Sequence, residues 1–495
     1  MERAPIIVVM GHIDHGKSTL LDYIRKSNVV EGEAGGITQH VSAYEISHKG
    51  KPITFIDTPG HEAVSSMREK GVAAADIAIL VVSAEDGVKP QTLEARNAIE
   101  KNKLPYVVAI NKIDKPNANV EKAKNTLVEN SIYIEGMGGE VPWSAISAKT
   151  GQGVPELLDL LLLVAEVAEL KQDKSKPAAG VILESKLDPR KGVSATVIVR
   201  DGTLRRGDYL VTAAQVEAES DCFRIKKLEN FRGEDVAELG PAQPGVVSGW
   251  NEVPPAGSPW QTCDTKGSAE KISSAANEGR PAAAGRVATE AAGDEKLVPI
   301  VLKADTAGTL EALKKEVLKI ALTGVKLQIT EAGIGAISES DIKLVSAKPE
   351  ALIVGFHVKV EKSAGDLASK YNLNPTTFDI IYKLSEWLEQ ELIKRRPVVE
   401  VETIVGTAKV VRLFSQAKTK QIVGALATEG EITPRKPVRV KRREAILGVG
   451  EVIELREQQN VVPAVAKGKQ FGALIESRIA IAVGDILEVF QIEKK

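Results

Sequence analysis

Apolar and polar positions over the first 170 residues follow a repeating pattern. Short apolar runs lie at residues 6–10, 53–56 and 106–110, and stretches with apolar residues at helical spacing separate them. Continuous apolar runs of this length are typical of strands that are buried on both faces, as in parallel sheets covered by helices. The pattern therefore predicts an α/β domain over residues 1–170.

The pattern changes several times after residue 170. Short alternating runs between glycine turns indicate β-barrels, whereas strand and helix patterns in alternation indicate a further α/β domain. The predicted order is a β-barrel at 178–265, a partly helical linker at 266–296, an α/β/α sandwich domain at 297–377, a connecting helix at 378–397 and a C-terminal β-barrel at 398–492. We expect the connecting helix to be a rigid arm, with packing against its own α/β domain as the alternative.

The first candidate site lies between the apolar run 6–10 and a predicted helix. Its residues are Gly11, His12, Ile13, Asp14, His15, Gly16, Lys17, Ser18 and Thr19. Glycines at this spacing let backbone N–H groups and a helix N-terminus converge on phosphate groups. Lys17 would reach the β- and γ-phosphates, and the Ser18 hydroxyl would ligate Mg²⁺. A glycine-containing turn with a chance Lys-Ser pair is the alternative.

Two more polar segments follow apolar runs. Asp57 would approach Mg²⁺ through a water, and the N–H of Gly60 would contact the γ-phosphate. Asp114 can accept hydrogen bonds from both N1–H and the 2-amino group of guanine, a donor pair that adenine lacks. The predicted guanine-binding residues are Asn111, Lys112, Asp114, Ser147, Ala148 and Lys149. Each segment alone could be an ordinary turn, but in this order they predict a GTP/GDP site with Mg²⁺ in a P-loop GTPase domain.

A glycine-rich segment at 31–40 is predicted to be a switch loop. Thr38 in this segment would reach the metal and the γ-phosphate, and an exposed linker is the alternative. His61 is the candidate catalytic residue, because it follows the proposed γ-phosphate contact and could orient the attacking water. Its alternative role is that of a surface histidine at a helix start.

Residues 11–19, 33–44, 57–62 and 111–114 resemble the translational GTPases. Within that group, residues 35–40 and 57–62, together with 303–308 and 333–341, are similar to the bacterial translation initiation factor two family. The resemblance implies that Lys17, Ser18, Thr38 and Asp57 handle phosphate and Mg²⁺, that Asn111, Lys112 and Asp114 read guanine, and that His61 becomes catalytic on the ribosome. It also implies an initiation factor that places initiator tRNA and promotes the joining of both ribosomal subunits.

The predicted C-terminal barrel carries a basic run and departs from the family pattern. The run at 435–443 is predicted to be an edge strand that holds tRNA phosphates, with a charged edge that resists aggregation as the alternative. Gln470, Phe471 and Ala425 stand where the family has other residues, so recognition of formyl-methionine stays open. A GTP-gated ribosome-assembly factor that carries no initiator tRNA is therefore the alternative function.

Composition limits the class of protein. The 495 residues carry a formal net charge of −2, which argues against a chain that coats nucleic acid along its whole length. The chain has two cysteines, and no apolar run approaches the roughly 20 residues of a membrane span. We therefore expect a cytoplasmic protein without a membrane partner, and we expect it to be a monomer. The family resemblance further implies a short form without the N-terminal extension that is common in bacterial members.

Overall fold

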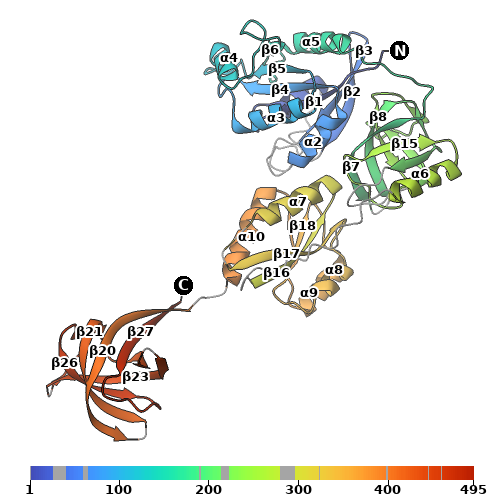
Figure 1. Ribbon diagram of the computed structural model, residues 1–495. Helices are drawn as coiled ribbons and strands as arrows, with labels where there is room; N and C mark the ends of the chain where they lie inside the picture. Colours follow the sequence, from blue (N-terminus) through green and yellow to red (C-terminus); the bar gives the residue numbers. More distant parts are fainter. Residues whose placement is uncertain are drawn as a thin grey trace. The chain divides into compact units, whose positions relative to one another are not determined.

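The computed structural model (Figure 1) divides into two compact units, Met1–Arg395 and Arg396–Lys495. The structure describes residues 2–25, 41–58, 65–188, 191–212, 222–278, 296–320, 322, 324–396, 400–417, 419–443, 445–458 and 460–494. No helix in these ranges is long and apolar enough to cross a membrane. The two units are described separately below.

A six-stranded sheet forms the start of the first unit. In their order across the sheet the strands are β2 (Ser42–His48), β3 (Lys51–Asp57), β1 (Ile6–Gly11), β4 (Ile77–Ser83), β5 (Tyr106–Asn111) and β6 (Trp143–Ala145). All neighbouring pairs are parallel except β2 with β3. Strands β1 and β4 are buried along their whole length, which explains their continuous apolar sequences.

Five helices cover both faces of this sheet. They are α1 (Lys17–Arg25), α2 (Ser65–Ala74), α3 (Pro90–Lys101), α4 (Val120–Glu129) and α5 (Val154–Val167). Side chains of α1 and α5 pack with Ile7 and Val9 on one face of β1, whereas α2, α3 and α4 pack on the face that carries Val8. The predicted α/β domain with a helix-covered, mostly parallel sheet is confirmed.

An antiparallel β-rich region follows in the first unit. Its seven-stranded sheet has the order β11 (Cys222–Arg224), β10 (Tyr209–Thr212), β15 (Pro259–Cys263), β7 (Ala179–Asp188), β8 (Gly192–Asp201), β14 (Pro244–Ser248) and β12 (Lys227–Asn230). Strands β9 (Leu204–Arg205) and β13 (Glu238–Leu239) form a separate pair. Helix α6 (Lys266–Glu278) begins where the partly helical linker was predicted, and residues 279–295 lie outside the described ranges.

The last part of the first unit is a small α/β domain. Its parallel sheet has the order β17 (Val325–Ile334), β16 (Lys296–Ala304), β18 (Leu352–Phe356) and β19 (Thr376–Phe378). Helices α7 (Ala307–Lys319) and α10 (Ile381–Arg395) cover one face, and α8 (Glu339–Val345) and α9 (Lys362–Lys370) cover the other (Figure 1). This arrangement is the predicted α/β/α sandwich.

Helix α10 packs on its own α/β domain. Its residues Leu384, Leu388 and Leu392 are spaced four apart and are fully buried, in one cluster with Leu313 of α7. Four-residue spacing puts side chains on one helix face, and here that face belongs to the domain core. The expectation of a rigid arm was therefore wrong, and the alternative of packing within the domain is correct.

The second unit is a closed antiparallel barrel. Its strands are β20 (Glu400–Ala417), β21 (Lys420–Ile432), β22 (Lys436–Arg442), β23 (Ala445–Glu457), β24 (Asn460–Val461), β25 (Val465–Ala466), β26 (Gln470–Glu476) and β27 (Ile486–Lys494). The order β20-β27-β22-β23-β26-β21 closes on itself because β20 also pairs with β21. Closure leaves these strands without the open edges of a flat sheet.

Candidate functional site

The loop between β1 and α1 adopts a backbone path that only certain residues allow. Gly11, Asp14 and Gly16 have positive φ angles of 144°, 63° and 84°. A Cβ atom on Gly11 would lie 2.4 Å from the carbonyl oxygen of Val81, and one on Gly16 would lie 2.4 Å from Nδ2 of Asn111. Both glycines are therefore required by backbone conformation and by close neighbours, as the sequence analysis expected for a phosphate loop.

Lys17 lies inside this loop at the first position of α1. Its Nζ donates hydrogen bonds to the carbonyl oxygens of Gly11, at 3.0 Å, and His12, at 2.7 Å. The residue is only 7% exposed, and burial lowers its pKa to about 8, although the negative charge of Asp57 opposes this shift. A buried ammonium group in the first turn of a helix adds its positive charge to the free N–H groups of the helix N-terminus, and together they favour an anionic ligand.

Asp57 reaches the same loop from the neighbouring strand. It is the last residue of β3, and its register partner in β1 is Val9, two residues before Gly11. The carboxyl ends of parallel strands meet at one edge of a sheet, so Asp57 and Ser18 belong to the same site. Carboxylate and hydroxyl oxygens suit Mg²⁺, which typically takes one or two protein ligands and completes its shell with waters and phosphates.

The predicted residues Thr38, Gly60 and His61 lie outside the described residues. Their roles at the metal, the γ-phosphate and the attacking water stay predictions. Among the residues that the structure describes, no group of three or more His, Cys, Asp or Glu side chains could hold a metal ion.

Asn111 joins the phosphate loop to the predicted guanine loop. Its Nδ2 donates to the carbonyl oxygen of His15 at 2.8 Å, and its Oδ1 accepts the N–H of Ala148 at 2.9 Å. The side chain is 1% exposed, so both bonds are shielded from water. Ala148 is one of the predicted guanine-binding residues, and its N–H is bonded to Asn111. Lys149 supplies the next backbone N–H of this loop.

Asp114 is exposed just beyond the carboxyl end of β5. Ser147, which follows β6, donates its hydroxyl to Oδ1 of Asp114 at 2.7 Å, and this bond holds the pKa of that carboxyl below its usual value. Strands β5 and β6 are neighbours, which explains why residues 33 apart in the chain meet. The result is an exposed, charged carboxylate with acceptor capacity open to solvent, close to the positive charges of Lys149 and Lys115.

The sequence analysis missed two residues that support the loop and α2. Gln91, in the first turn of α3, accepts the N–H of Ile13 through Oε1 at 3.0 Å. Arg68 of α2 is 4% exposed, and its Nη2 lies 3.1 Å from Oε2 of Glu94 in α3. The sequence did contain a signal for Gln91. It is a polar residue directly after Pro90, at the start of a predicted helix that follows a buried strand.

His15 lies on the inner side of the loop. Its side chain is fully buried, with Nδ1 3.3 Å from the carbonyl oxygen of Val81, and burial lowers its pKa to about 4. The imidazole is therefore neutral at physiological pH. A neutral, buried ring packs the loop against β4 and adds no charge to the phosphate site.

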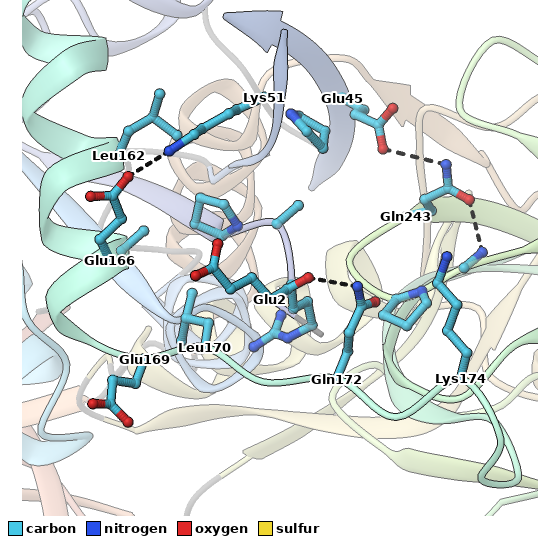
Figure 2. A pocket seen from close by; sticks show the side chains of 17 residues that line it. Glu2, Glu45, Lys51, Leu162, Glu166, Glu169, Leu170, Gln172, Lys174 and Gln243 are labelled. Carbon is cyan, nitrogen blue, oxygen red and sulfur yellow. Dashed lines mark hydrogen bonds and ion pairs between the residues drawn. The ribbon is translucent and has the colours of Figure 1, made fainter.

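A cavity of about 400 Å³ lies at the opposite edge of the sheet. Residues that precede β1 and begin β3 line it together with the turn at Gly240, so it is remote from the carboxyl ends of these strands. Figure 2 shows Lys51 paired with Glu166 at 2.5 Å, and Nε2 of Gln243 donating to Glu45 at 3.5 Å. This cavity is thus separate from the phosphate loop and the guanine loop.

The basic run of the C-terminal barrel is not an edge strand. Strand β22 pairs with β23 on one side and β27 on the other. Its cations have acidic partners on neighbouring segments, because Arg439 pairs with Glu402, Lys441 with Glu488, and Arg442 with Asp485. The expected edge strand was therefore wrong, and much of its positive charge is compensated within the barrel.

Phe471 and Ala425, which depart from the family pattern, face each other in the barrel core. They are register partners on β26 and β21, and their exposures are 5% and 2%. The small alanine leaves space for the large ring across the strand pair, as close-packed interiors require. Gln470 is exposed beside this pair, so the three departures divide between the core and the surface.

Three family descriptions match this chain. Residues 2–166 match the elongation factor Tu GTP binding domain, residues 177–260 match elongation factor G domain 2, and residues 273–389 match translation-initiation factor 2. These matches cover the α/β domain with the phosphate loop, the antiparallel sheet and the smaller α/β domain in order.

Curated relatives match along nearly the whole chain. A protein of Nitratiruptor sp. named translation initiation factor IF-2 is 41% identical over 99% of the chain and 59% of its own length. A protein of the same name from Rubrobacter xylanophilus is 38% identical over 99% of the chain and 72% of its own length. The crystal structure of GDP-bound aIF5B from Aeropyrum pernix aligns over 99% of the chain with 27% identity and a TM-score of 0.47.

Proposed function

The chain belongs to the translation initiation factor IF-2 family, and on that premise we propose that it is a GTP-binding translation initiation factor that hydrolyses GTP to GDP and phosphate. The chain spans about 60% of the length of several relatives, including 59% of the Nitratiruptor protein, so the activity of the whole family protein is a proposal here. The ribosome is the proposed partner, and stimulates the hydrolysis.

One observation supports this proposal most strongly. Asn111 is the last residue of β5 and Asp114 lies three residues beyond it, and Asn111 is bonded directly to the loop after β1 at His15. This bond supports a site in which the proposed base-reading carboxylate and the proposed phosphate loop are held at a fixed separation. A site of that kind would bind both the base and the phosphates of one nucleotide, which is the property a GTP switch needs.

We propose that the chain's own groups act as follows in hydrolysis. Lys17 would exchange its carbonyl partners for the β- and γ-phosphates. Ser18, and Asp57 through a water, would hold Mg²⁺, which would supply positive charge to the phosphate oxygens. His61 would orient the water whose oxygen attacks the γ-phosphorus; the bond to the bridging oxygen breaks, GDP leaves, and the proton of the water passes to the released phosphate. Thr38 would contact the γ-phosphate and help to hold Mg²⁺ before hydrolysis, and would lose these contacts afterwards.

The test measures GTP turnover with isolated small subunits, isolated large subunits and both together, with and without initiator tRNA and messenger. An initiation factor that promotes subunit joining is expected to need both subunits. His61→Ala should retain GTP affinity and lose the stimulated turnover, because its proposed role is confined to positioning the water. Equal stimulated rates in this variant and the parent would contradict the catalytic role of His61.

We further propose that the C-terminal barrel faces initiator tRNA, because the resemblance of the sequence to the initiation factor two family implies a factor that places initiator tRNA. The compensated charges of β22 and the buried Phe471 favour a second candidate, a GTP-gated ribosome-assembly factor that carries no tRNA. Binding of formylated and unformylated initiator tRNA over a salt series separates the two. Stimulation of GTP turnover by one bare subunit, indifferent to initiator tRNA, would favour the assembly factor.

A further inference from the structure

Glu184 is a buried carboxyl group that links two domains of the first unit. It lies on strand β7 of the antiparallel sheet, and it is 6% exposed. Its Oε1 accepts the N–H of Gly308 and the N–H of Ser185, each at 3.0 Å. Gly308 lies in the first turn of α7, so a side chain of the antiparallel β-rich region satisfies a helix terminus of the smaller α/β domain.

The position of Glu184 matches the ligand site of an open α/β sheet. In the order β17-β16-β18-β19, the second and third strands of the domain lie on opposite sides of the first. Ligands of such sheets bind outside the carboxyl ends of the strands at this point, where a helix N-terminus favours an anion. Here Glu184 occupies the N-terminus of α7, the helix that follows β16.

Helix α2 also packs where Glu184 of β7 meets the N-terminus of α7. A Cβ atom on Gly308 would lie 2.6 Å from Cε of Met67 in α2 and 2.7 Å from Oε2 of Glu184. Lys70 of α2 also forms an ion pair with Glu311 of α7. The junction, which we define by Glu184, Gly308 and Met67, therefore joins α2, β7 and α7 without space for an added methyl group.

We propose that Glu184 positions the α/β domain against α2, and that it does so best as a neutral carboxyl group. Its Oε2 is buried and, among the described residues, has no hydrogen-bond partner. An ionised oxygen in that position lacks the donors that a buried charge requires. A protonated oxygen there is a buried hydroxyl, which costs less free energy than a buried charge even without an acceptor. The proposal goes beyond nucleotide hydrolysis and does not depend on it.

The direction of the proton linkage follows from the surroundings of Glu184. Burial raises its pKa to about 7, and the negative charge of Asp305 adds to this shift, against the hydrogen bonds from Gly308, Ser185 and the side chain of Thr306. An exposed glutamate has a pKa near 4.5. The docked state therefore binds a proton more tightly than the undocked state, so docking weakens as pH rises from 4.5 through 7.

Other charged groups near the junction titrate in different ways. Lys70 of α2 forms an ion pair with Glu311 of α7. Burial acts to raise the pKa of Glu311, but Lys70 and Lys315 lower it further, so Glu311 stays charged between pH 4.5 and 7. On the β18 side, Nδ1 of His357 lies 3.6 Å from Oδ2 of Asp305, and although burial acts to lower its pKa, the bonds to Asp305 and Asp379 raise it. On β8, the register partner of Glu184 is the uncharged Thr196. His357 is therefore the group that a pH experiment must control.

The experiment measures hydrogen exchange of the backbone amides at residues 306–310 in the full chain. Rates at pH 6 and pH 8 are corrected for the intrinsic pH dependence of exchange. The parent is compared with Glu184→Gln, which imitates the neutral carboxyl group, and with Glu184→Ala, which removes the acceptor. His357→Gln controls for the histidine, and Glu156→Gln, at an exposed site on α5, controls for the loss of a carboxylate.

In the parent, protection is expected to fall about tenfold between pH 6 and pH 8, as expected for one group with a pKa of about 7. Glu184→Gln should be protected equally at both pH values. Glu184→Ala should be less protected than the parent at Gly308 at both pH values, because only this amide bonds to Glu184, and the two controls should behave as the parent does. A parent-like pH dependence in Glu184→Gln, or parent-like protection in Glu184→Ala, would overturn the proposal. If Glu184→Ala fails to fold, Glu184→Gln alone tests the proposal: loss of the pH dependence of protection supports it, and a parent-like pH dependence overturns it.

Discussion

Single side chains decide which base the proposed site accepts, and Asp114 is the clearest case. Asp114→Asn replaces one acceptor oxygen by an amide donor, so the variant matches xanthine, which has an acceptor at position 2, better than guanine. Hydrogen bonds to a charged group contribute about 1.5 to 3 kcal/mol each, so GTP affinity should fall at least about a hundredfold. Titration with GTP and XTP checks this. Asp366→Asn, at an exposed site on α9, is the control, and unchanged GTP preference in Asp114→Asn would exclude a base-reading role.

Lys17 should make nucleotide binding depend on pH. Burial holds its pKa at about 8 in the free protein, below the 10.5 of an exposed lysine, so the folded state binds fewer protons than the unfolded state between these values. Its contribution to stability therefore rises with pH across that window, and the cost of the buried charge is fully present below pH 8. Phosphate groups favour the ammonium form, so GTP binding should take up protons above pH 8.

Calorimetry at pH 7 and pH 8.5, in buffers with different heats of ionisation, measures this proton uptake. The Lys17-dependent uptake should be near zero at pH 7 and should approach one proton as pH passes 8. Lys17→Met is the control, because it has no titrating group at this position. Equal uptake at pH 8.5 in the parent and in this variant would show that Lys17 does not interact with the phosphates.

At the scale of helices and strands, the sequence pattern predicts local features and misses features that depend on distant segments. The strand, loop and helix around Lys17 are local, because glycine spacing and a buried apolar run determine them within 20 residues. The interior position of β22 is not local, because it depends on pairing with β27, which lies almost 50 residues away. The bond from Gly308 to Glu184 spans 124 residues and has no signal in either segment alone.

Helix α10 gives a direct test of packing at the element scale. Leu388→Ala should lower the free energy of unfolding of the first unit by about 2 to 5 kcal/mol, because Leu388 is fully buried and its loss leaves a cavity. Leu318→Ala in α7 is the matched control, since Leu318 is 66% exposed and should change stability by less than about 0.5 kcal/mol. Denaturant unfolding of both variants checks the difference. Equal stability would mean that the leucine stripe is exposed, as in a rigid arm.

At the scale of the whole molecule, the hydrophobic clusters follow the two units. One cluster of buried residues runs from Ile6 through Leu183 to Leu392, so the three folded parts of the first unit share apolar contacts. The barrel of the second unit has its own cluster, from Ala408 to Val489. Each unit therefore has a core built from its own residues, and cooperative unfolding is expected within each unit.

This division predicts how GTP changes thermal unfolding. Calorimetry of the full chain should resolve two transitions, and GTP with Mg²⁺ should raise only the one that belongs to the first unit. A ligand that binds the native state adds RT ln(1 + [L]/Kd), which is about 2.7 kcal/mol at a hundred times Kd. ATP at the same concentration is the control, because it lacks the donors that Asp114 would accept. An equal shift of both transitions by GTP would show that the two units unfold together, and an equal shift by ATP would show that Asp114 does not select the base.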